Sequence, residues 1–265
     1  MYKSFFHQQT EVFYQKLGRG ARTVMLIHGF PEDGSIFQYQ CDFLKENYTV
    51  LVLDLPGSGK SSYNKELKSV EDFAELIRGV LQEEKIERCF LLGHSMGGYI
   101  ALAFAEKYSK HLLGLGLIHS TGFADSDEKK DNRKRAIGFM EQYGGASFLK
   151  TMIPDLFGKA FKEAHQAVID EMIEKGRNFE TKALQQYYSI MLLRKERTYV
   201  LKEINVPVLF IAGEADKAIP LKDILQQVVM PDIAIIKILS KAAHMGFLEE
   251  SSTVNDAIGQ LVGFM

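Results

Sequence analysis

The sequence predicts an α/β protein with a doubly wound, mostly parallel sheet and an inserted helical cap. Three observations support this fold class. Short apolar runs recur without alternating between apolar and polar residues, as in strands that helices cover on both faces. Segments with helical spacing separate these runs. Between Gly122 and Thr198 the strand-like runs disappear, and helical segments follow one another.

The strands are expected where the apolar runs occur. Residues 5–17 alternate imperfectly between apolar and polar side chains and predict an opening hairpin or an edge strand. Six buried strands are predicted at residues 23–28, 48–53, 89–92, 112–118, 207–212 and 233–239.

The helices of the core follow from apolar spacing. Residues 69–81 carry apolar side chains three and four positions apart, which predicts an amphipathic helix with Ser69 placed to cap it. A more apolar helix is expected at 97–108, and a terminal one at 250–264. Strands that alternate with helices in this way favour a parallel sheet.

The cap is expected to comprise residues 122–198, and the core residues 1–121 and 199–265. Four helical stretches centre on Ile137, Phe148, Val168 and Tyr188, after a highly charged run at 124–135. Residues 129–135 of this run are more typical of a solvated helix face than of an anion site. No internal repeat of solenoid length is visible.

Composition excludes several classes of protein. The chain has 265 residues, of which 46% are apolar and 25% charged, as in ordinary globular proteins. With 32 basic and 34 acidic residues the formal net charge is −2, so nucleic acid is not an expected partner. Cys41 and Cys89 match no metal or disulfide pattern and are expected to be reduced and structural.

Targeting signals are not apparent. Gln8, Gln9 and Glu11 interrupt the N-terminal residues before an apolar core of a secretion signal could form. The longest apolar stretches fall far short of the ~18 residues that a membrane span needs. These observations predict a cytoplasmic protein with no membrane span.

A candidate nucleophile lies in the motif Gly93-His-Ser-Met-Gly97, between a predicted strand and a predicted helix. In this context the motif indicates a nucleophile elbow, whose sharp turn exposes the Ser95 hydroxyl. Glycines two positions before and after the serine leave out side chains that would collide. The helix N-terminus also favours developing negative charge. The alternative is a tight glycine-rich turn with an inert serine.

A serine needs a base and an orienting carboxylate, and two later loops offer them. Asp216, with Glu214 as a rival, follows the strand predicted at 207–212, and His244 follows the strand at 233–239. Each candidate comes after a strand, at the edge of the sheet where α/β proteins bind ligands. The alternatives are a solvated turn aspartate and a surface loop histidine. The other histidines precede the core, lie in turns already assigned, fall in or beside helices, or end a strand: His7, His28, His94, His111, His119 and His165.

Five motifs in this order resemble the α/β-hydrolase superfamily, in its serine esterase-like branch with a helical cap. Besides the elbow and the two loops at 213–216 and 243–244, residues 28–31 (His-Gly-Phe-Pro) resemble the family's oxyanion loop. Residues 54–61 resemble its D-x-P-G-x-G-x-S turn. The resemblance implies the α/β-hydrolase fold over nearly the whole chain. It also implies an oxyanion hole formed by the backbone N–H groups of Phe30 and Met96.

Two departures narrow the chemistry. Position 95 is serine, whereas the epoxide hydrolase and haloalkane dehalogenase branches carry aspartate there, and the chain has no tryptophan for halide binding. Residues 56–61 end like a phosphate-binding loop, but Asp54 stands where that loop requires glycine. A nucleotide site is therefore disfavoured.

The predicted function is that of a serine hydrolase that cleaves a carboxylic ester of a small, largely apolar substrate through an acyl-enzyme. Ser95 would attack, His244 would act as base and acid, and Asp216 would orient the imidazole. No cofactor and no metal are expected. Alternatives are a C–C bond hydrolase, a lactonase or a perhydrolase with the same triad, and a low-turnover ligand receptor. Substrate, pathway and oligomeric state stay open.

The cap is expected to line part of the substrate pocket, because it would lie over the elbow. Its Met and aromatic side chains suit an apolar, adaptable group, although most of them would serve packing. The pocket candidates are His28, Phe139, Met152, Tyr187 and Met191.

Overall fold

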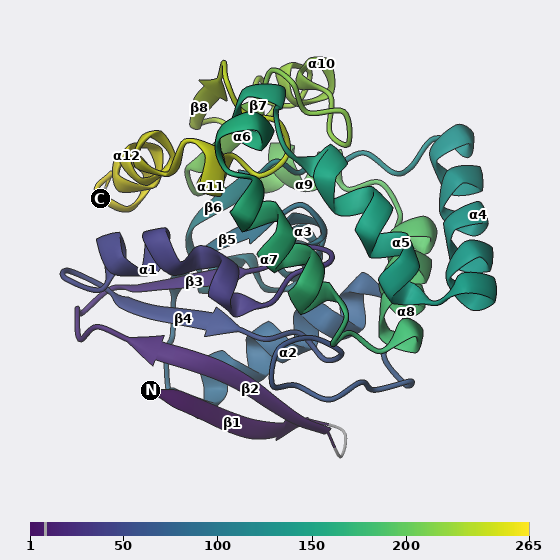
Figure 1. Ribbon diagram of the computed structural model, residues 1–265. Coiled ribbons are helices and arrows are strands. Elements are labelled where there is room, and N and C mark those ends of the chain that lie inside the picture. Colours follow the sequence, from purple (N-terminus) through teal and green to yellow (C-terminus); the bar gives the residue numbers. More distant parts are fainter. Residues whose placement is uncertain (8–9, 265) are drawn as a thin grey trace.

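The computed structural model describes residues 1–7 and 10–264, which form an eight-stranded, mostly parallel sheet (Figure 1). The strand order is β1-β2-β4-β3-β5-β6-β7-β8, and β3 to β8 run parallel to one another. The strands are β1 Tyr2–His7, β2 Thr10–Leu17, β3 Thr23–Ile27, β4 Thr49–Leu53, β5 Cys89–His94, β6 Leu112–Ile118, β7 Val208–Gly213 and β8 Ala234–Leu239. A strand is present at each of the six predicted positions, which confirms the fold class. Strand β8 was expected to be buried, but it lies at the edge of the sheet and is mostly exposed or half-buried.

The N-terminal segment forms a hairpin at the edge of the sheet. Strand β1 pairs antiparallel with β2, and β2 pairs antiparallel with β4. Residues 8 and 9, which belong to the hairpin or edge strand predicted at 5–17, lie outside the described residues, as does residue 265 of the predicted core.

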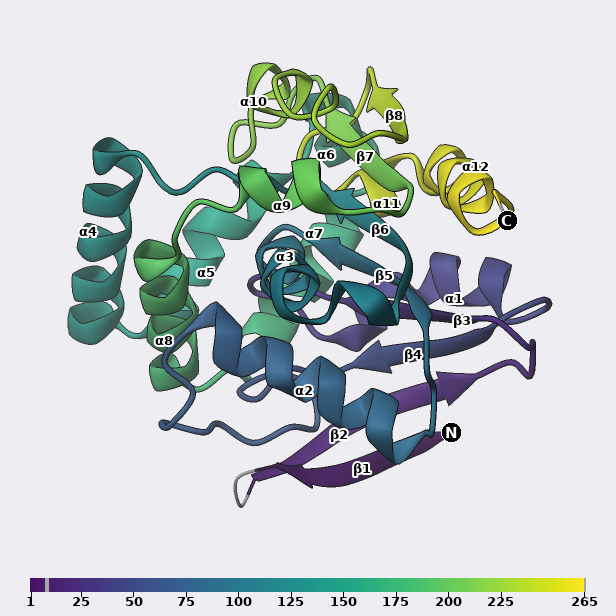
Figure 2. The same ribbon diagram turned by 180° about the vertical axis from the view of Figure 1, so that it is seen from behind.

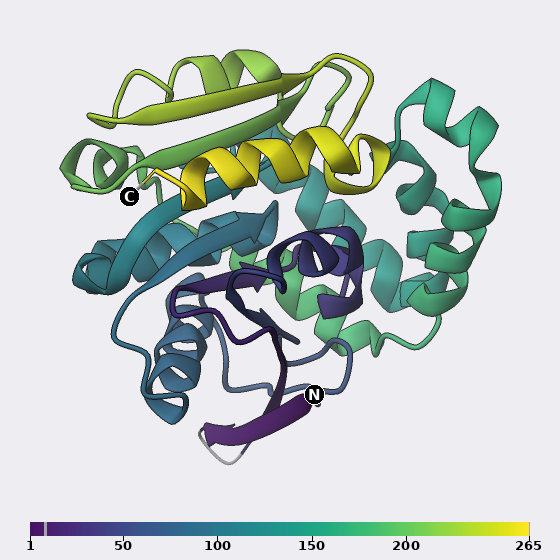
Figure 3. The same cartoon turned by 90° about the vertical axis from the view of Figure 1, so that its left-hand side faces the viewer.

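Helices cover both faces of the sheet. Helices α1 and α12 lie on one face (Figures 1 and 3), and α2, α3 and α9 lie on the other (Figure 2). The helices outside the insertion are α1 Gln38–Leu44, α2 Val70–Glu83, α3 Met96–Tyr108, α9 Thr198–Glu203, α10 Leu221–Leu225, α11 Gly246–Glu249 and α12 Ser251–Val262, with 3-10 turns at Gly34–Phe37 and Ser109–His111. Four short helices, α1, α9, α10 and α11, were not predicted.

The predicted cap on helix α2 is present and reciprocal. The Ser69 hydroxyl accepts a hydrogen bond from the Asp72 N–H (3.2 Å), and the Asp72 carboxylate accepts one from the Ser69 N–H (2.9 Å). This capping box satisfies two backbone donors that a helix N-terminus leaves unpaired. Cys41 and Cys89 are buried free thiols, as expected.

The segment between β6 and α9 is helical and lies to one side of the sheet (Figure 1). Its helices are α4 Asp127–Tyr143, α5 Gly145–Met152, α6 Lys159–Ala164, α7 Gln166–Gly176 and α8 Thr181–Leu193, with a 3-10 turn at Ile153–Leu156. Helices α4, α5, α7 and α8 stand at the four predicted positions. The short helix α6 was not predicted.

The described part of the chain contains no helix with both the length and the apolar character that crossing a membrane requires.

The turn at residues 54–61 is organised by Asp54, whose carboxylate accepts hydrogen bonds from the N–H groups of Gly34 (2.9 Å) and Lys60 (3.0 Å). The next helix begins only at Val70. A phosphate-binding loop would require a helix directly after Lys60.

Candidate active site

Ser95 lies in a strained turn between β5 and α3. Its backbone has φ 50° and ψ −115°, and a positive φ is costly for a residue with a side chain. A Cβ added to Gly93 would lie 2.3 Å from the Gly97 carbonyl carbon, and one added to Gly97 would lie 2.2 Å from the Ile27 oxygen. Both glycines are therefore required by close backbone contact, as the motif predicts.

Asp216 and His244 lie on the loops after β7 and β8 and form a buried pair. His244 Nδ1 is 2.8 Å from Asp216 Oδ2. The other carboxylate oxygen accepts hydrogen bonds from the N–H groups of Ala218 and Ile219, each at 2.9 Å. Glu214, the rival acid, is exposed and is not hydrogen-bonded to His244.

The pair shifts the pKa values of both groups. Burial opposes ionisation of Asp216, but the adjacent His244 and hydrogen bonds from two histidines outweigh it and hold the pKa of Asp216 well below its usual range. Burial likewise opposes protonation of His244, but the Asp216 charge outweighs it and raises the pKa of His244. Asp216 is therefore positioned to stabilise an imidazolium at His244.

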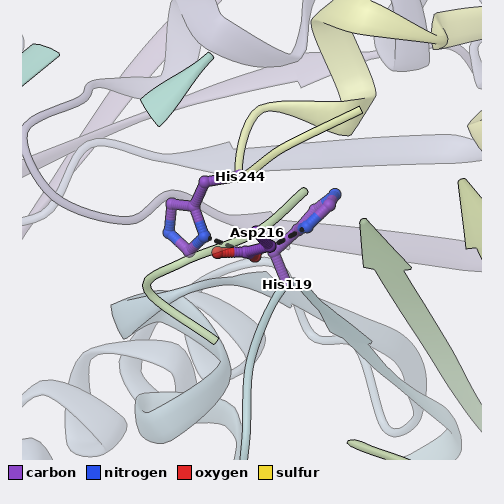
Figure 4. A group of neighbouring side chains, drawn as sticks. All are labelled: His119, Asp216 and His244. Atoms are coloured by element: carbon purple, nitrogen blue, oxygen red, sulfur yellow. Dashed lines mark hydrogen bonds and ion pairs between the residues drawn. The ribbon is translucent and has the colours of Figure 1, made fainter. Parts of the chain in front are cut away.

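A second histidine, His119, shares Asp216. Figure 4 shows the two imidazole rings on either side of the Asp216 carboxylate. His119 Nδ1 lies 3.1 Å from Asp216 Oδ2, and His119 Nε2 accepts the Gly246 N–H at 3.2 Å. These contacts place the proton on Nδ1. Burial lowers the pKa of His119 to about 4, so the ring is neutral near pH 7.

The sequence argument set His119 aside as the end of the strand before the insertion. The structure shows why the position matters: β6 ends beside β7, so His119 reaches the loop that carries Asp216. A polar residue directly after a buried strand, at the edge of the sheet shared by the other candidates, is the signal that could have identified it.

His119, Asp216 and His244 are also side chains of metal-binding type, with potential ligand atoms within 4.8 Å of one another. However, both Nδ1 atoms point to the same Asp216 oxygen, and Nε2 of His119 accepts a backbone hydrogen bond. The arrangement is that of a hydrogen-bonded chain. A metal ion would have to displace these bonds.

The backbone around His244 is fixed by groups from three other segments. The His244 N–H donates to the Leu156 carbonyl (2.9 Å), and the His244 carbonyl lies 2.9 Å from His94 Nε2. His94 Nδ1 lies 3.0 Å from the buried carboxylate of Glu32. Glu249 accepts hydrogen bonds from the N–H groups on both sides of His244. Sequence reasoning missed Glu32 and Glu249, which lie next to recognised motifs.

Ser95 and His244 both line a cavity of about 740 Å³ between the core and the helical segment. Ser95 Oγ makes no hydrogen bond to any residue that the structure describes, His244 included. Catalytic hydrogen bonds are often long in the absence of substrate. Within residues 1–7 and 10–264, no hydrogen bond is found from the N–H groups of Phe30 and Met96.

Of the five pocket candidates, Met152 and Met191 line this cavity. The other lining side chains of apolar character come from both the core and the helical segment: Phe30, Ala136, Phe148, Leu156, Ala218 and Ile219. The apolar lining thus surrounds the space next to Ser95 and His244.

His28, Phe139 and Tyr187 do not line the cavity, so these three expectations were wrong. His28 is buried below the turn, with Nε2 accepting the Leu55 N–H (3.0 Å). The Tyr187 hydroxyl donates to the Pro56 carbonyl at 2.9 Å, which ties α8 to the core. Phe139 is 38% exposed, and its ring lies beside those of Tyr143 and Phe148. Helical spacing identifies a face but not which neighbour that face meets.

A family model described as "Serine aminopeptidase, S33" matches residues 19–251. The chain belongs to this family, within the α/β-hydrolase superfamily. This membership places the chain among the hydrolases and confirms the resemblance drawn from the motifs. A solved α/β-hydrolase, a thermophilic esterase from Thermogutta terrifontis with malate bound, superposes with a TM-score of 0.90 at 27% identity and covers 96% of this chain and 93% of its own.

Curated relatives carry varied names. The chain is 28% identical over 259 residues to the dihydrolipoyllysine-residue acetyltransferase component of an acetoin cleaving system from Cupriavidus necator. That match covers 95% of this chain and 66% of the relative, so the chain spans about two thirds of its length. A 2-hydroxy-6-oxononadienedioate/2-hydroxy-6-oxononatrienedioate hydrolase from Paraburkholderia phymatum is 35% identical over 115 residues, 42% of this chain and 40% of the relative.

Proposed function

We propose that the chain is a serine hydrolase that cleaves carboxylic esters of small, largely apolar substrates through an acyl-enzyme. Ser95 is the nucleophile, His244 the base and acid, and Asp216 the carboxylate that orients His244. One observation carries the proposal: a serine on a strained strand-to-helix turn and a histidine paired with a buried carboxylate line the same cavity. This is the constellation that acyl transfer requires.

The proposed reaction follows from the donors and acceptors in the cavity. His244 uses Nδ1–H toward Asp216, which leaves Nε2 to accept the Ser95 proton as Oγ attacks the ester carbonyl. The N–H groups of Phe30 and Met96 would stabilise the oxyanion, and the loss of one such donor typically costs ~3 kcal/mol. The imidazolium then protonates the leaving alcohol. Water, deprotonated by the same imidazole, cleaves the acyl-enzyme.

We also propose that residues 122–198 act as a cap over a core of residues 1–121 and 199–265. Residues of α4, α5 and α8 contribute to the cavity that contains Ser95, and Leu156 bonds the backbone of His244. The cap would thus set the size of the substrate. The dependence of turnover on ester chain length would measure this size.

The known relatives support this proposal to different degrees. The Thermogutta protein is an esterase that covers nearly the whole chain, which favours ester cleavage. The Paraburkholderia relative is named for a different reaction and supports, over less than half of the chain, a C–C bond hydrolase with the same triad as the second candidate. The family description names an aminopeptidase, so an ester and its matching amide belong in the same substrate panel.

The test is intact mass measurement after incubation with a fluorophosphonate probe, alongside a p-nitrophenyl ester chain-length series. We expect one adduct on the wild type and on Ser62→Ala, which removes an exposed serine, and none on Ser95→Ala. Ester hydrolysis that survives Ser95→Ala would overturn the mechanism. Adduct formation with turnover slower than minutes would favour a ligand receptor, and preferred cleavage of a vinylogous acid, a lactone or a peracid would favour the other hydrolase reactions.

A further inference from the structure

We infer that the substrate carries a carboxylate, and that Arg133, together with the hydroxyl of Tyr99, binds it in the cavity beside Ser95. The inference rests on the proposed function and refines its substrate class: a mostly apolar ester with one anionic end. It starts from a wall of the cavity that carries two basic side chains, Lys129 and Arg133.

The cationic wall is one face of helix α4. Lys129, Asn132, Arg133 and Ala136 line the cavity at intervals of three and four residues, which is the spacing of a single helix face. Lys129 is half-buried and donates to the Ala218 carbonyl (3.1 Å), and burial lowers its pKa.

Arg133 is held in place through one of its nitrogens and keeps the others available. Its Nε donates to Asp125 Oδ2 at 2.5 Å, and its guanidinium lies 5.2 Å from the centre of the Tyr188 ring. The side chain is 17% exposed, and in the described part of the chain no acceptor is bonded to its Nη groups. A guanidinium fixed in this way presents a planar pair of donors, the geometry that matches a carboxylate.

Tyr99 supplies a second donor on the same side. It follows Ser95 by four residues, one turn along α3, and lines the cavity. Arg194 covers its ring at 3.9 Å, while its hydroxyl has no hydrogen-bond partner among residues 1–7 and 10–264. Because Tyr99 lines the cavity, its hydroxyl is free to donate to a ligand there.

The charge balance favours an anion. Asp125 is buried between Arg133 and Arg194 (2.9 Å to the latter), so one carboxylate faces two guanidinium groups and a positive charge remains. The acidic residues that line the cavity, Glu128 and Asp155, are both exposed to solvent. Lys217, a third lining cation, is exposed as well. Excess positive charge at low exposure is costly unless a ligand compensates it.

The test compares esters that differ only in a carboxylate. On the acyl side the pair is the mono-4-nitrophenyl ester of glutaric acid and 4-nitrophenyl pentanoate; on the alcohol side it is 4-acetoxybenzoate and 4-methylphenyl acetate. In at least one pair we expect the wild type to favour the anionic ester in kcat/KM by about ten-fold or more, as for a hydrogen bond to a charged group. Arg133→Gln should abolish the preference, so that the ratio of kcat/KM for the anionic ester to kcat/KM for the neutral ester falls to about one.

The matched control is Lys134→Gln, which removes a positive charge one residue along α4 from an exposed side chain and should keep the preference. The ratio of the kcat/KM values for two substrates, measured on one preparation, does not depend on the fraction of folded protein. Arg194 still pairs Asp125 in Arg133→Gln, so the buried carboxylate is not left alone. Equal kcat/KM values for both members of both pairs, or a preference that persists in Arg133→Gln, would overturn the inference and leave the ester hydrolase intact.

A binding experiment separates the inference from the proposed reaction. Glutarate, titrated calorimetrically into Ser95→Ala, should bind at least about ten-fold more tightly than to Ser95→Ala with Arg133→Gln. This result would support the anion site even if no ester were cleaved. Equal affinity, or no binding to either protein, would refute the site whatever the outcome of the fluorophosphonate labelling.

Discussion

The His119 ring makes the stability of this protein depend on pH, and His119→Asn tests this. His119 has φ 48°, a conformation that asparagine tolerates better than most residues. Asparagine does not ionise and can still donate a hydrogen bond. The substitution therefore removes the titrating group with little backbone strain.

The size of this pH-dependent change in unfolding free energy follows from the difference between the pKa of His119 in the folded and in the unfolded protein. The unfolded chain binds a proton at His119 below its ordinary pKa of 6.5, whereas the folded protein binds it only near pH 4. The stability that neutral His119 contributes is thus present above pH 6.5 and is lost as the pH falls toward 4. Since one pKa unit corresponds to about 1.4 kcal/mol, this loss is about 3 kcal/mol between pH 7 and pH 4.

Urea unfolding of the wild type and His119→Asn at pH 7, 5.5 and 4 measures this loss. At pH 7 the variant should be the less stable of the two, and the difference in unfolding free energy should shrink by about 3 kcal/mol by pH 4. His165→Asn, at an exposed position, controls for the loss of a histidine as such. A difference that stays constant with pH would refute the neutral, buried state assigned to His119.

Two further outcomes are expected. Asp216 raises the pKa of His244, and only the unprotonated ring can act as a base. The kcat/KM for a neutral ester should therefore rise with pH, with a midpoint above about 6.5. A midpoint at or below this value would contradict the raised pKa of His244. Gly97→Ala should lower the unfolding free energy by about 2 kcal/mol or more, because the new Cβ would lie 2.2 Å from a backbone oxygen. Gly138→Ala is the control in the same urea titrations. It lies in α4, where a Cβ would meet no atom within 4 Å, and should raise the unfolding free energy by about 0.5 to 1 kcal/mol.

The parallel strands and the order of the motifs were predictable because each depends on local sequence. A run such as Val208–Gly213 is apolar throughout since both faces of its strand are covered, and its end fixes the loop that carries Asp216. The edge of the sheet then brings Asp216 and His244 together without further information. The glycines of the elbow are set by contacts within a few ångströms of Ser95.

Contacts between distant segments were not predictable in this way. His119 and Asp216 are 97 residues apart, and the sequence does not show that His119 and His244 contact the same Asp216 oxygen. Tyr187 and Met191 are four residues apart in α8 and so lie on the same face of that helix. Yet the Tyr187 hydroxyl donates to the Pro56 carbonyl of the core, whereas Met191 lines the cavity. Periodicity defines a face of a helix, and only the packing of that helix decides what the face meets.

Helix α4 shows how this limit hides the anion site that we propose from sequence reasoning. Its charged run, expected as a solvated face, in fact serves two environments: Lys130 and Lys134 pair with aspartates one turn away on the outer side. Arg133 turns inward to Asp125, which lies before the helix begins. A run of charged residues looks uniform in sequence, but a helix distributes its side chains over opposite faces. The anion site that we propose therefore depends on the orientation of α4 rather than on the composition of its residues.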